Sequence, residues 1–214
     1  MWKFKQLIRC CPLCGWLWTE QNGLCRSCWS YLLNQRLKSF QQNRTMDGIQ
    51  TRSLFDWGSH NDAGIRRLVL SLKGGAGDRA LWRELSVALA RSWIEAREGH
   101  GWVIVPSPPR KHGHEDHAVL LARMLGNLLG IEVRPALRRR DSRRRQKRLG
   151  RLARRAQSPH DQFEVIDRGN KYRRVLFVDD VVTTGATATG AWESLGRPKH
   201  FQVWSIARRL SCRP

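Results

Sequence analysis

The segment with the clearest chemical content joins an apolar run to two acids and then to small polar residues. Residues 175–178 (Val-Leu-Phe-Val) are followed by Asp179, Asp180 and the run Val-Val-Thr-Thr-Gly-Ala-Thr. The apolar run predicts a buried strand that delivers two carboxylates to a sheet edge. Backbone N–H groups and hydroxyls at a helix start suit a phosphate, and paired carboxylates accept hydrogen bonds from vicinal hydroxyls or bind Mg²⁺. The segment therefore predicts a sugar-phosphate site; the alternative is a capping aspartate and an ordinary turn.

Cysteines near the N-terminus form a second cluster of chemical residues. Five of the six lie in the first 28 residues, and four form two Cys-x-x-Cys pairs: Cys11, Cys14, Cys25 and Cys28. Two such pairs let four thiolates surround one zinc ion at about 2.3 Å, in a closed site that supports structure. The alternative is disulfide or redox chemistry, which a reducing cytosol disfavours. Cys10 is a spare thiol that is able to replace Cys11.

Positive charge is concentrated in one stretch of the chain. Lys and Arg number 39 against 18 acids, a net charge of +21, and residues 138–155 hold eleven basic residues and one acid. We interpret this stretch as a helix that contacts nucleic-acid phosphates. The alternatives are a solvated helix face or a flap that closes over a phosphorylated substrate. The residues that we expect to contact nucleic acid are Arg143, Arg144, Arg145, Lys147 and Arg148.

The elements that position these residues alternate between helices and strands. Apolar spacing predicts helices at 79–98, 118–129 and about 185–195, and strands at 102–105, 175–178 and 201–207. This alternation predicts an α/β fold with a parallel sheet covered on both faces, and ligands that bind where strands end. A short helix after the cysteines leads to a boundary near residue 45. We therefore expect a zinc-binding module with a linker helix at 1–44 and a second domain at 45–214.

Composition excludes several classes of protein. Hydrophobic residues make up 41% of the 214 residues, which is enough for a core and excludes wholesale disorder. No run of 18 residues lacks a charge, and no secretory h-region is evident, so we expect a cytoplasmic protein without membrane insertion.

Ten tryptophans include Trp16, Trp18 and Trp29 near the cysteines. They either stack on single-stranded bases or pack in the core.

The segment with the two acids closely resembles the ribose-phosphate signature of type I phosphoribosyltransferases and matches it at every position. The resemblance implies that Asp179 and Asp180 hold the ribose 2′- and 3′-hydroxyls of phosphoribosyl pyrophosphate, which binds with Mg²⁺. It also implies a loop around the 5′-phosphate that consists of Thr183, Thr184, Gly185, Ala186 and Thr187.

Together with the cysteine pairs, this segment makes the chain resemble the ComF (ComFC/GntX-like) family, which is associated with competence for DNA uptake. Residues 65–74, the Val-Pro-Ser-Pro run at 105–108 and the spaced Arg138, Gln146 and Arg154 are also similar. The resemblance implies a type I phosphoribosyltransferase-like parallel sheet flanked by helices, with a small zinc-ribbon-like N-terminal module. It places Lys73 and Gly74 after the first strand, where pyrophosphate binds; the alternative is a common turn.

One stretch departs from the family and leaves two functions open. An Arg-Gly-Phe-Asn-Gln type of sequence is replaced by residues 110–117, which include His112, His114 and His117. These histidines belong to a surface loop, a substrate or DNA contact, or a metal site. One function is Mg²⁺-assisted displacement of pyrophosphate from C1 of phosphoribosyl pyrophosphate. The other is a non-catalytic, zinc-bearing protein that binds single-stranded DNA and uses the pocket for sensing or for contacting a DNA end. For either function we expect DNA-uptake or recombination proteins as partners.

Overall fold

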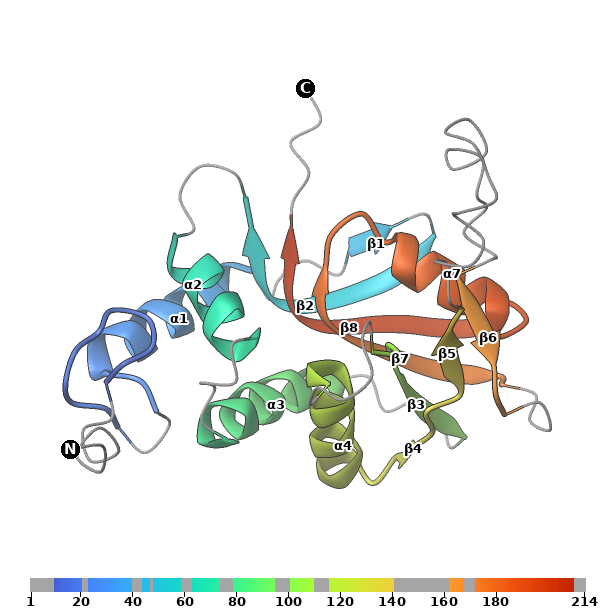
Figure 1. The fold of residues 1–214 in the computed structure, drawn as a ribbon, viewed down its shortest axis with the longest axis horizontal. Coiled ribbons are helices and arrows are strands. Elements are labelled where there is room, and N and C mark those ends of the chain that lie inside the picture. The colour runs from blue at the N-terminus through green and yellow to red at the C-terminus, as the bar shows by residue number, and fades with distance from the viewer. Residues whose placement is uncertain are drawn as a thin grey trace.

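The computed structural model describes residues 10–20, 23–39, 44–46, 48–58, 63–73, 79–94, 101–109, 116–140, 162–167 and 172–209, which form an α/β fold (Figure 1). In chain order the elements are α1 (Arg26–Ser39), β1 (Arg44–Met46), β2 (Ile49–Trp57), α2 (Ala63–Lys73), α3 (Arg79–Ile94), β3 (Trp102–Pro106), α4 (His117–Leu129), β4 (Glu132–Val133), β5 (Leu137–Arg139), β6 (Phe163–Val165), β7 (Arg174–Val182), α7 (Ala186–Ser194) and β8 (His200–Arg209).

The central sheet has the strand order β1-β2-β8-β7-β3-β4. The five strands from β2 to β4 in this order are parallel, whereas β1 pairs antiparallel with β2. β7 lies inside the sheet, between β8 and β3. The predicted parallel sheet with flanking helices is confirmed.

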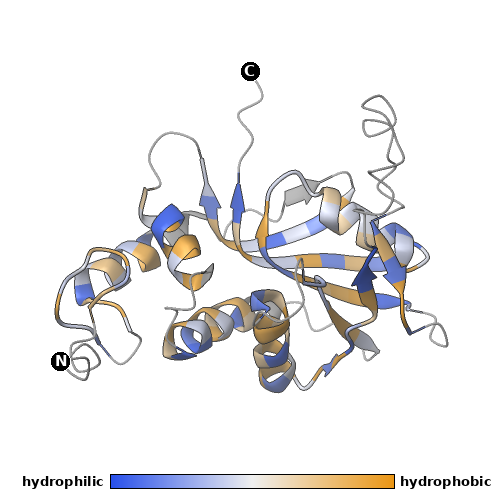
Figure 2. Cartoon of the chain, viewed as in Figure 1, coloured by the Kyte–Doolittle hydropathy of each residue, from blue (hydrophilic) through white to orange (hydrophobic). Residues whose placement is uncertain are grey.

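Each face of the sheet carries its own hydrophobic core. Leu176 and Val178 of β7 pack in a cluster with residues of α2, α3 and α4, whereas Val175 and Phe177 pack in a second cluster with residues of β6 and α7. This division follows from the alternation of side chains along a strand. Because both faces are covered, the central strands are hydrophobic along most of their length, as the orange of β3 and β7 in Figure 2 shows.

The helices and strands expected from apolar spacing are present with small changes in their bounds. The helices predicted at 79–98, 118–129 and 185–195 correspond to α3, α4 and α7, and the short helix after the cysteines is α1. The three predicted strands correspond to β3, β7 and β8. β7 continues four residues beyond the prediction, to Val182, so Asp179 and Asp180 belong to the strand itself.

We predicted a helix for the basic stretch, but its start forms a strand. Arg138 and Arg139 lie in β5, which pairs antiparallel with β6 in a separate two-stranded sheet. The buried side chains of Leu137 and Phe163 explain this pairing, because both contribute to the core on the β6 and α7 face. The predicted nucleic-acid contacts Arg143, Arg144, Arg145, Lys147 and Arg148 lie outside the described residues.

The cysteine segment packs directly on the α/β fold. Leu13, Leu24 and Leu32 belong to the same buried cluster as Leu54 of β2 and Ile65 of α2. The division into domains at residues 44 and 45 stays a prediction. Within the described ranges, no helix has both the length and the apolar character that crossing a membrane requires.

Candidate functional site

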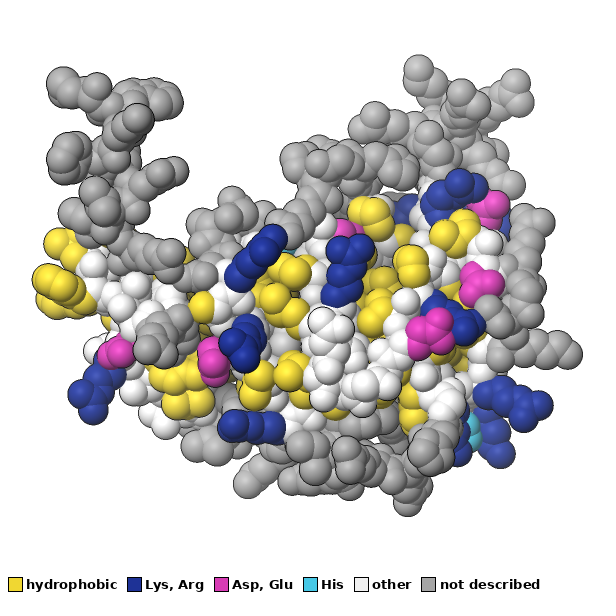
Figure 3. All heavy atoms as spheres, turned by 90° about the horizontal axis from the view of Figure 1, so that it is seen from below, with side chains coloured by type: hydrophobic (Ala, Val, Ile, Leu, Met, Phe, Trp, Pro, Cys, Tyr) yellow, Lys and Arg dark blue, Asp and Glu magenta, His cyan; other side chains and the backbone are white. Residues whose placement is uncertain are grey.

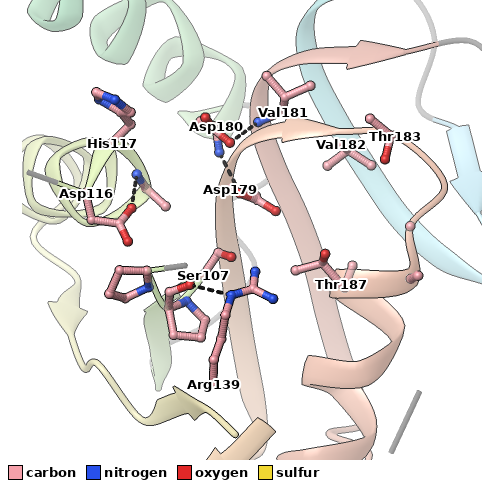
Figure 4. A pocket seen from close by; sticks show the side chains of 16 residues that line it. Ser107, Asp116, His117, Arg139, Asp179, Asp180, Val181, Val182, Thr183 and Thr187 are labelled. Carbon is pink, nitrogen blue, oxygen red and sulfur yellow. Dashed lines mark hydrogen bonds between the residues drawn. The ribbon is translucent and has the colours of Figure 1, made fainter. Parts of the chain in front are cut away.

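A cavity of about 380 Å³ opens where β3 and β7 end (Figure 4). This is the position that the sequence predicted, at the carboxyl ends of parallel strands. The cavity is lined by the loop after β3, the start of α4, β5, the end of β7, the loop that follows β7 and the start of α7. The lining residues include Ser107, Pro108, Asp116, Arg139, Asp179 and Thr187.

Asp179 and Asp180 both line the cavity but belong to opposite faces of the sheet. Asp180 shares a smaller cavity with Leu72 of α2 and Trp82 of α3, whereas the carboxyl group of Asp179 points toward the side of Thr187 (Figure 4). The backbone N–H of Asp180 donates to Asp179 Oδ1 at 2.9 Å, and that of Val181 donates to Asp180 Oδ1 at 2.8 Å. The carboxyl groups of two consecutive residues of one strand therefore reach the same cavity from opposite faces of the sheet.

The environment of Asp179 opposes its negative charge. Burial and the neighbouring charge of Asp180 raise the pKa of Asp179 to about 8, against a smaller opposing effect from Arg139. Burial also raises the pKa of Asp116, although hydrogen bonds from the backbone N–H groups of Ala118 and Val119 oppose the shift. Strongly shifted carboxyl groups in a cavity are typical of functional sites.

The loop between β7 and α7 presents a helix N-terminus to the cavity. Gly185 lies at the N-cap with φ of 77°, a left-handed conformation that glycine adopts without steric cost. The hydroxyl of Thr184 accepts a hydrogen bond from the backbone N–H of Ala186 at 3.4 Å. Of the five residues predicted to surround a 5′-phosphate, Thr183, Gly185, Ala186 and Thr187 line the cavity, and Thr184 is not among its lining residues.

The start of α4 contributes Asp116, which the site prediction did not include, and His117, one of the three histidines whose role the sequence left open. Asp116 is the N-cap of α4, and its Oδ1 accepts a hydrogen bond from the backbone N–H of Ala118 at 2.9 Å. The ring of His117 stacks on that of Trp82, with centroids 5.7 Å apart and an interplanar angle of 8°. An acid directly before an amphipathic helix is an N-cap signal that could have identified Asp116. His112 and His114 lie outside the described residues.

The loop after β3, where the sequence predicted ligand binding at a strand end, lines the cavity together with β5, which the sequence did not predict. Ser107 and Pro108 follow β3 directly and line the cavity, and the backbone N–H of Ser107 donates to the carbonyl of Val178 at 2.8 Å. Arg139 lines the cavity from β5. Its position depends on the pairing of β5 with β6, which no local sequence pattern predicts.

Lys73 and Gly74 had been predicted to bind pyrophosphate. Lys73 is the last residue of α2, so a helix separates it from β2, and Gly74 lies outside the described residues. Leu72, the preceding residue, contributes to the small cavity beside Asp180, so α2 ends near the acids. The pyrophosphate role of Lys73 and Gly74 stays a prediction.

The four predicted cysteines form a compact cluster away from this cavity. The Sγ atoms of Cys11, Cys14, Cys25 and Cys28 all lie within 4.8 Å of one another, and those of Cys14 and Cys25 are 3.6 Å apart. Zinc–sulfur bonds of about 2.3 Å in a tetrahedron place sulfur atoms about 3.8 Å apart, so the four thiols are close enough to hold one zinc ion. Cys10 is exposed and does not belong to the cluster.

The thiols of this cluster differ in acidity. Burial raises the pKa of the Cys11 thiol, but hydrogen bonds from the backbone N–H groups of Cys25, Leu13 and Cys14 outweigh it and lower the pKa to about 7. Burial and the neighbouring thiols raise the pKa of Cys28. A bound dication would favour the thiolate form of every ligand, which couples metal binding to proton release.

No family model matches the chain, and no curated protein matches it. Among solved structures, the crystal structure of TT1426 from Thermus thermophilus aligns with a TM-score of 0.37 and 16% identity, over 62% of this chain and 85% of that chain.

Proposed function

We propose that the cavity binds phosphoribosyl pyrophosphate with Mg²⁺ and that the chain is a ComF-like protein with a type I phosphoribosyltransferase domain. The observation that carries this proposal is the convergence of two carboxylates of β7 and the N-terminus of α7 on one cavity. Carboxylates accept hydrogen bonds from vicinal hydroxyls, and a helix N-terminus favours a phosphate. A ribose 5-phosphate group satisfies both requirements at once.

Different residues of the chain bind different parts of this ligand. Asp179 and Asp180 hold the ribose hydroxyls, and the loop from Thr183 to Thr187 surrounds the 5′-phosphate. Mg²⁺ prefers carboxylate and phosphate oxygens, and when bound it would reduce the charge of the pyrophosphate group. The reaction that such a pocket supports is transfer of the phosphoribosyl group to a nucleophile with release of pyrophosphate.

Calorimetry with Mg²⁺ and phosphoribosyl pyrophosphate tests the pocket. We expect Asp179→Asn and Asp180→Asn each to weaken binding about tenfold, because charge-assisted hydrogen bonds to the ligand are lost. Glu132→Gln is the matched control, since Glu132 is an exposed carboxylate that pairs with Arg134 outside the cavity, and it should bind as the wild type does. Absence of binding by the wild-type protein would refute the proposal.

We also propose single-stranded DNA as a partner, in keeping with a role in DNA uptake and natural competence alongside DNA-uptake or recombination proteins. A specific observation supports this partner: Trp16 and Trp18, next to the cysteine cluster, are 61% and 77% exposed. Exposed aromatic rings offer stacking surfaces for bases. Figure 3 shows Lys and Arg side chains spread over one face rather than gathered in one patch, so the dense basic run of the sequence is the stronger candidate for phosphate contacts.

Electrophoretic shifts with single-stranded DNA over a salt series test this partner. Replacing Arg143, Arg144 and Arg145 with Gln should lower affinity and flatten its dependence on salt, because fewer counterions are released. Replacing Trp16 and Trp18 with Ala should lower affinity with little change in the salt slope. DNA binding without any activity toward phosphoribosyl pyrophosphate would favour the non-catalytic alternative, in which the pocket serves for sensing.

A further inference from the structure

We propose that a basic surface at the amino-terminal edge of the parallel sheet binds the phosphate backbone of single-stranded DNA, at the opposite end of the strands from the cavity. This inference rests on the proposed DNA partner and adds a contact surface to residues 143–148 and the two exposed tryptophans. Five side chains make up this surface, which we call the edge patch: Arg173, Arg174, Arg197, Lys199 and His200.

The register of the central strands brings most of the edge patch together. Arg174 starts β7 and is the Cα partner of His200, which starts β8. The backbone N–H of His200 donates to the carbonyl oxygen of Arg173 at 3.2 Å, and Lys199 directly precedes His200 in the chain. Adjacent strands lie about 4.8 Å apart, so basic residues from two distant segments of the sequence form one group.

The turn after α7 adds Arg197 to this group. Its backbone N–H donates to the carbonyl oxygen of Trp192 at 2.9 Å, and its guanidinium carbon lies 5.4 Å from the centroid of the Trp192 ring. Nε1 of Trp192 donates to the carbonyl oxygen of Pro198 at 3.2 Å, which fixes the chain just before Lys199. Glu193 offsets part of the positive charge, since its Oε1 lies 3.8 Å from Nη2 of Arg197. The edge patch nevertheless keeps an excess of positive charge.

The backbone of Arg197 has a conformation that arginine disfavours. Among the non-glycine residues that the structure describes, Arg197 alone has a left-handed φ, of 55°. Glycine adopts this conformation without steric cost, whereas a residue with a Cβ atom does not. Strained residues of this kind are often found at functional sites. An arginine at this position is understandable if its exposed side chain binds an anion.

The edge patch and the cavity lie at opposite ends of the same strands. Arg174 and Asp180 are six positions apart in β7, and a strand rises about 3.3 Å per residue, so about 20 Å separates them. The edge patch therefore does not reach a small ligand in the cavity and requires an anion of its own.

An extended polyanion fits the edge patch better than a small anion does. Four of its five residues are exposed, and they come from the start of β7, the turn after α7 and the start of β8. Several cations on an open edge attract a chain of phosphates, and each contact with a phosphate releases counterions. The exposed ring of His200 adds a planar surface for an unpaired base. Single-stranded DNA supplies both phosphates and unpaired bases.

Fluorescence anisotropy with a labelled oligothymidine over a salt series tests this surface. The first variant combines three changes in the edge patch: Arg173→Gln, Arg197→Gln and Lys199→Gln. The matched control removes the same charge from exposed arginines of α2 and α3: Arg66→Gln, Arg83→Gln and Arg91→Gln. In Figure 1 α2 and α3 lie toward the end of β8, whereas the edge patch lies at its start.

We expect the edge-patch variant to bind about tenfold more weakly, with a slope of log affinity against log salt that is smaller by about 2, because three phosphate contacts are lost. The control variant should keep the slope of the wild type. Arg197→Gly alone should weaken DNA binding without lowering the Tm, since glycine suits this backbone conformation. Both triple variants should bind phosphoribosyl pyrophosphate as the wild type does.

Four results would contradict these expectations. Equal losses of DNA affinity in the two triple variants would show that overall charge determines binding, and would overturn the inference. Wild-type affinity in the edge-patch variant would overturn it as well. Loss of phosphoribosyl pyrophosphate binding in that variant would contradict the separation of the edge patch from the cavity. A wild-type protein that does not bind the oligothymidine would instead refute the proposed DNA partner, and this inference with it.

Discussion

The carboxyl group of Asp179 lies in surroundings that disfavour its ionised form. Burial and the charge of Asp180 raise its pKa to about 8, and Arg139 offsets only part of this shift. An acid in such surroundings reduces the stability of the free protein at neutral pH, unless a ligand or ion compensates for it. This loss of stability is understandable if the carboxyl group of Asp179 is there to bind a ligand and not to stabilise the fold.

This arrangement predicts a pH-dependent gain in stability from Asp179→Asn. The folded-state pKa of about 8 exceeds the ordinary value of 3.8, so the folded protein binds this proton more tightly than the unfolded chain does. The stability that the neutral acid provides is present below about pH 4 and is lost as the pH rises to about 8. The variant should thus exceed the wild type by at least about 1 kcal/mol at pH 8, with a smaller difference at pH 4.

Urea denaturation between pH 4 and pH 9, without ligand, measures this difference. Thr187→Ala is the control: it alters the same cavity without removing a titrating group, so its effect on the free energy of unfolding should not vary with pH. A constant difference between Asp179→Asn and the wild type across this range would show that the pKa of Asp179 is not raised in the folded protein.

At the level of elements, local apolar patterns were sufficient to predict the strands that are buried on both faces of the sheet. β3 and β7 contain continuous apolar runs, and β8 is apolar from Phe201 to Ala207 except at Gln202 and Ser205, so all three were predicted from the sequence. β2 was missed, although it pairs with β8 along much of its length. In β2 the buried Ile49 and Leu54 are separated by polar residues such as Gln50 and Arg52, and its neighbour on the other side is the short strand β1. A strand near a sheet edge need not be apolar throughout, so its pattern is weak.

The candidate site was predictable only where its residues are contiguous. The acids of β7 and the loop before α7 form one sequence motif. This motif was enough to predict most of the residues that line that side of the cavity. Arg139 was assigned to a helix together with the rest of the basic stretch, because apolar residues at helical spacing follow it in the sequence. The structure instead pairs it with Phe163, 24 positions later in the sequence, in the antiparallel register of β5 and β6. Such pairing depends on tertiary packing, which a local sequence pattern does not contain.

The contact between α1 and α2 leads to a prediction about the packing of these two helices. A Cβ atom on Gly64 of α2 would lie 2.6 Å from Cε1 of Tyr31 on α1, so Gly64→Ala forces the aromatic ring or the helix to move. We expect a loss of about 1 to 3 kcal/mol in the free energy of unfolding, despite the higher helix propensity of alanine. Urea denaturation measures the loss.

A double-mutant cycle supplies the control for this contact. Tyr31→Ala removes the obstructing ring, so Gly64→Ala should cost little in that background. An equal cost of Gly64→Ala with and without the tyrosine ring would mean that this contact does not limit the approach of the two helices.

For the molecule as a whole, the cysteine cluster and the sheet share one core. Cys11, Leu13 and Cys25 are buried in the cluster of residues that also contains Leu54 of β2 and Leu68 of α2. Arg67 adds a polar link, since its Nη1 donates to the carbonyl oxygen of Leu13 at 3.1 Å. A metal that orders the cysteine loops therefore also supports packing against the helices that cover this face of the sheet.

This continuity predicts that zinc loss destabilises more than the cysteine segment. We expect the purified protein to hold about one zinc per chain, and Cys14→Ser to lose the metal and lower the Tm by about 5 °C or more. Metal analysis and calorimetric melting measure both effects, with Cys10→Ser as the matched control because Cys10 is exposed and outside the cluster. Since the core is shared, the wild type should melt in one transition that shifts as a unit. A low-temperature transition in Cys14→Ser, with the main transition unmoved, would instead show that the cysteine segment unfolds independently.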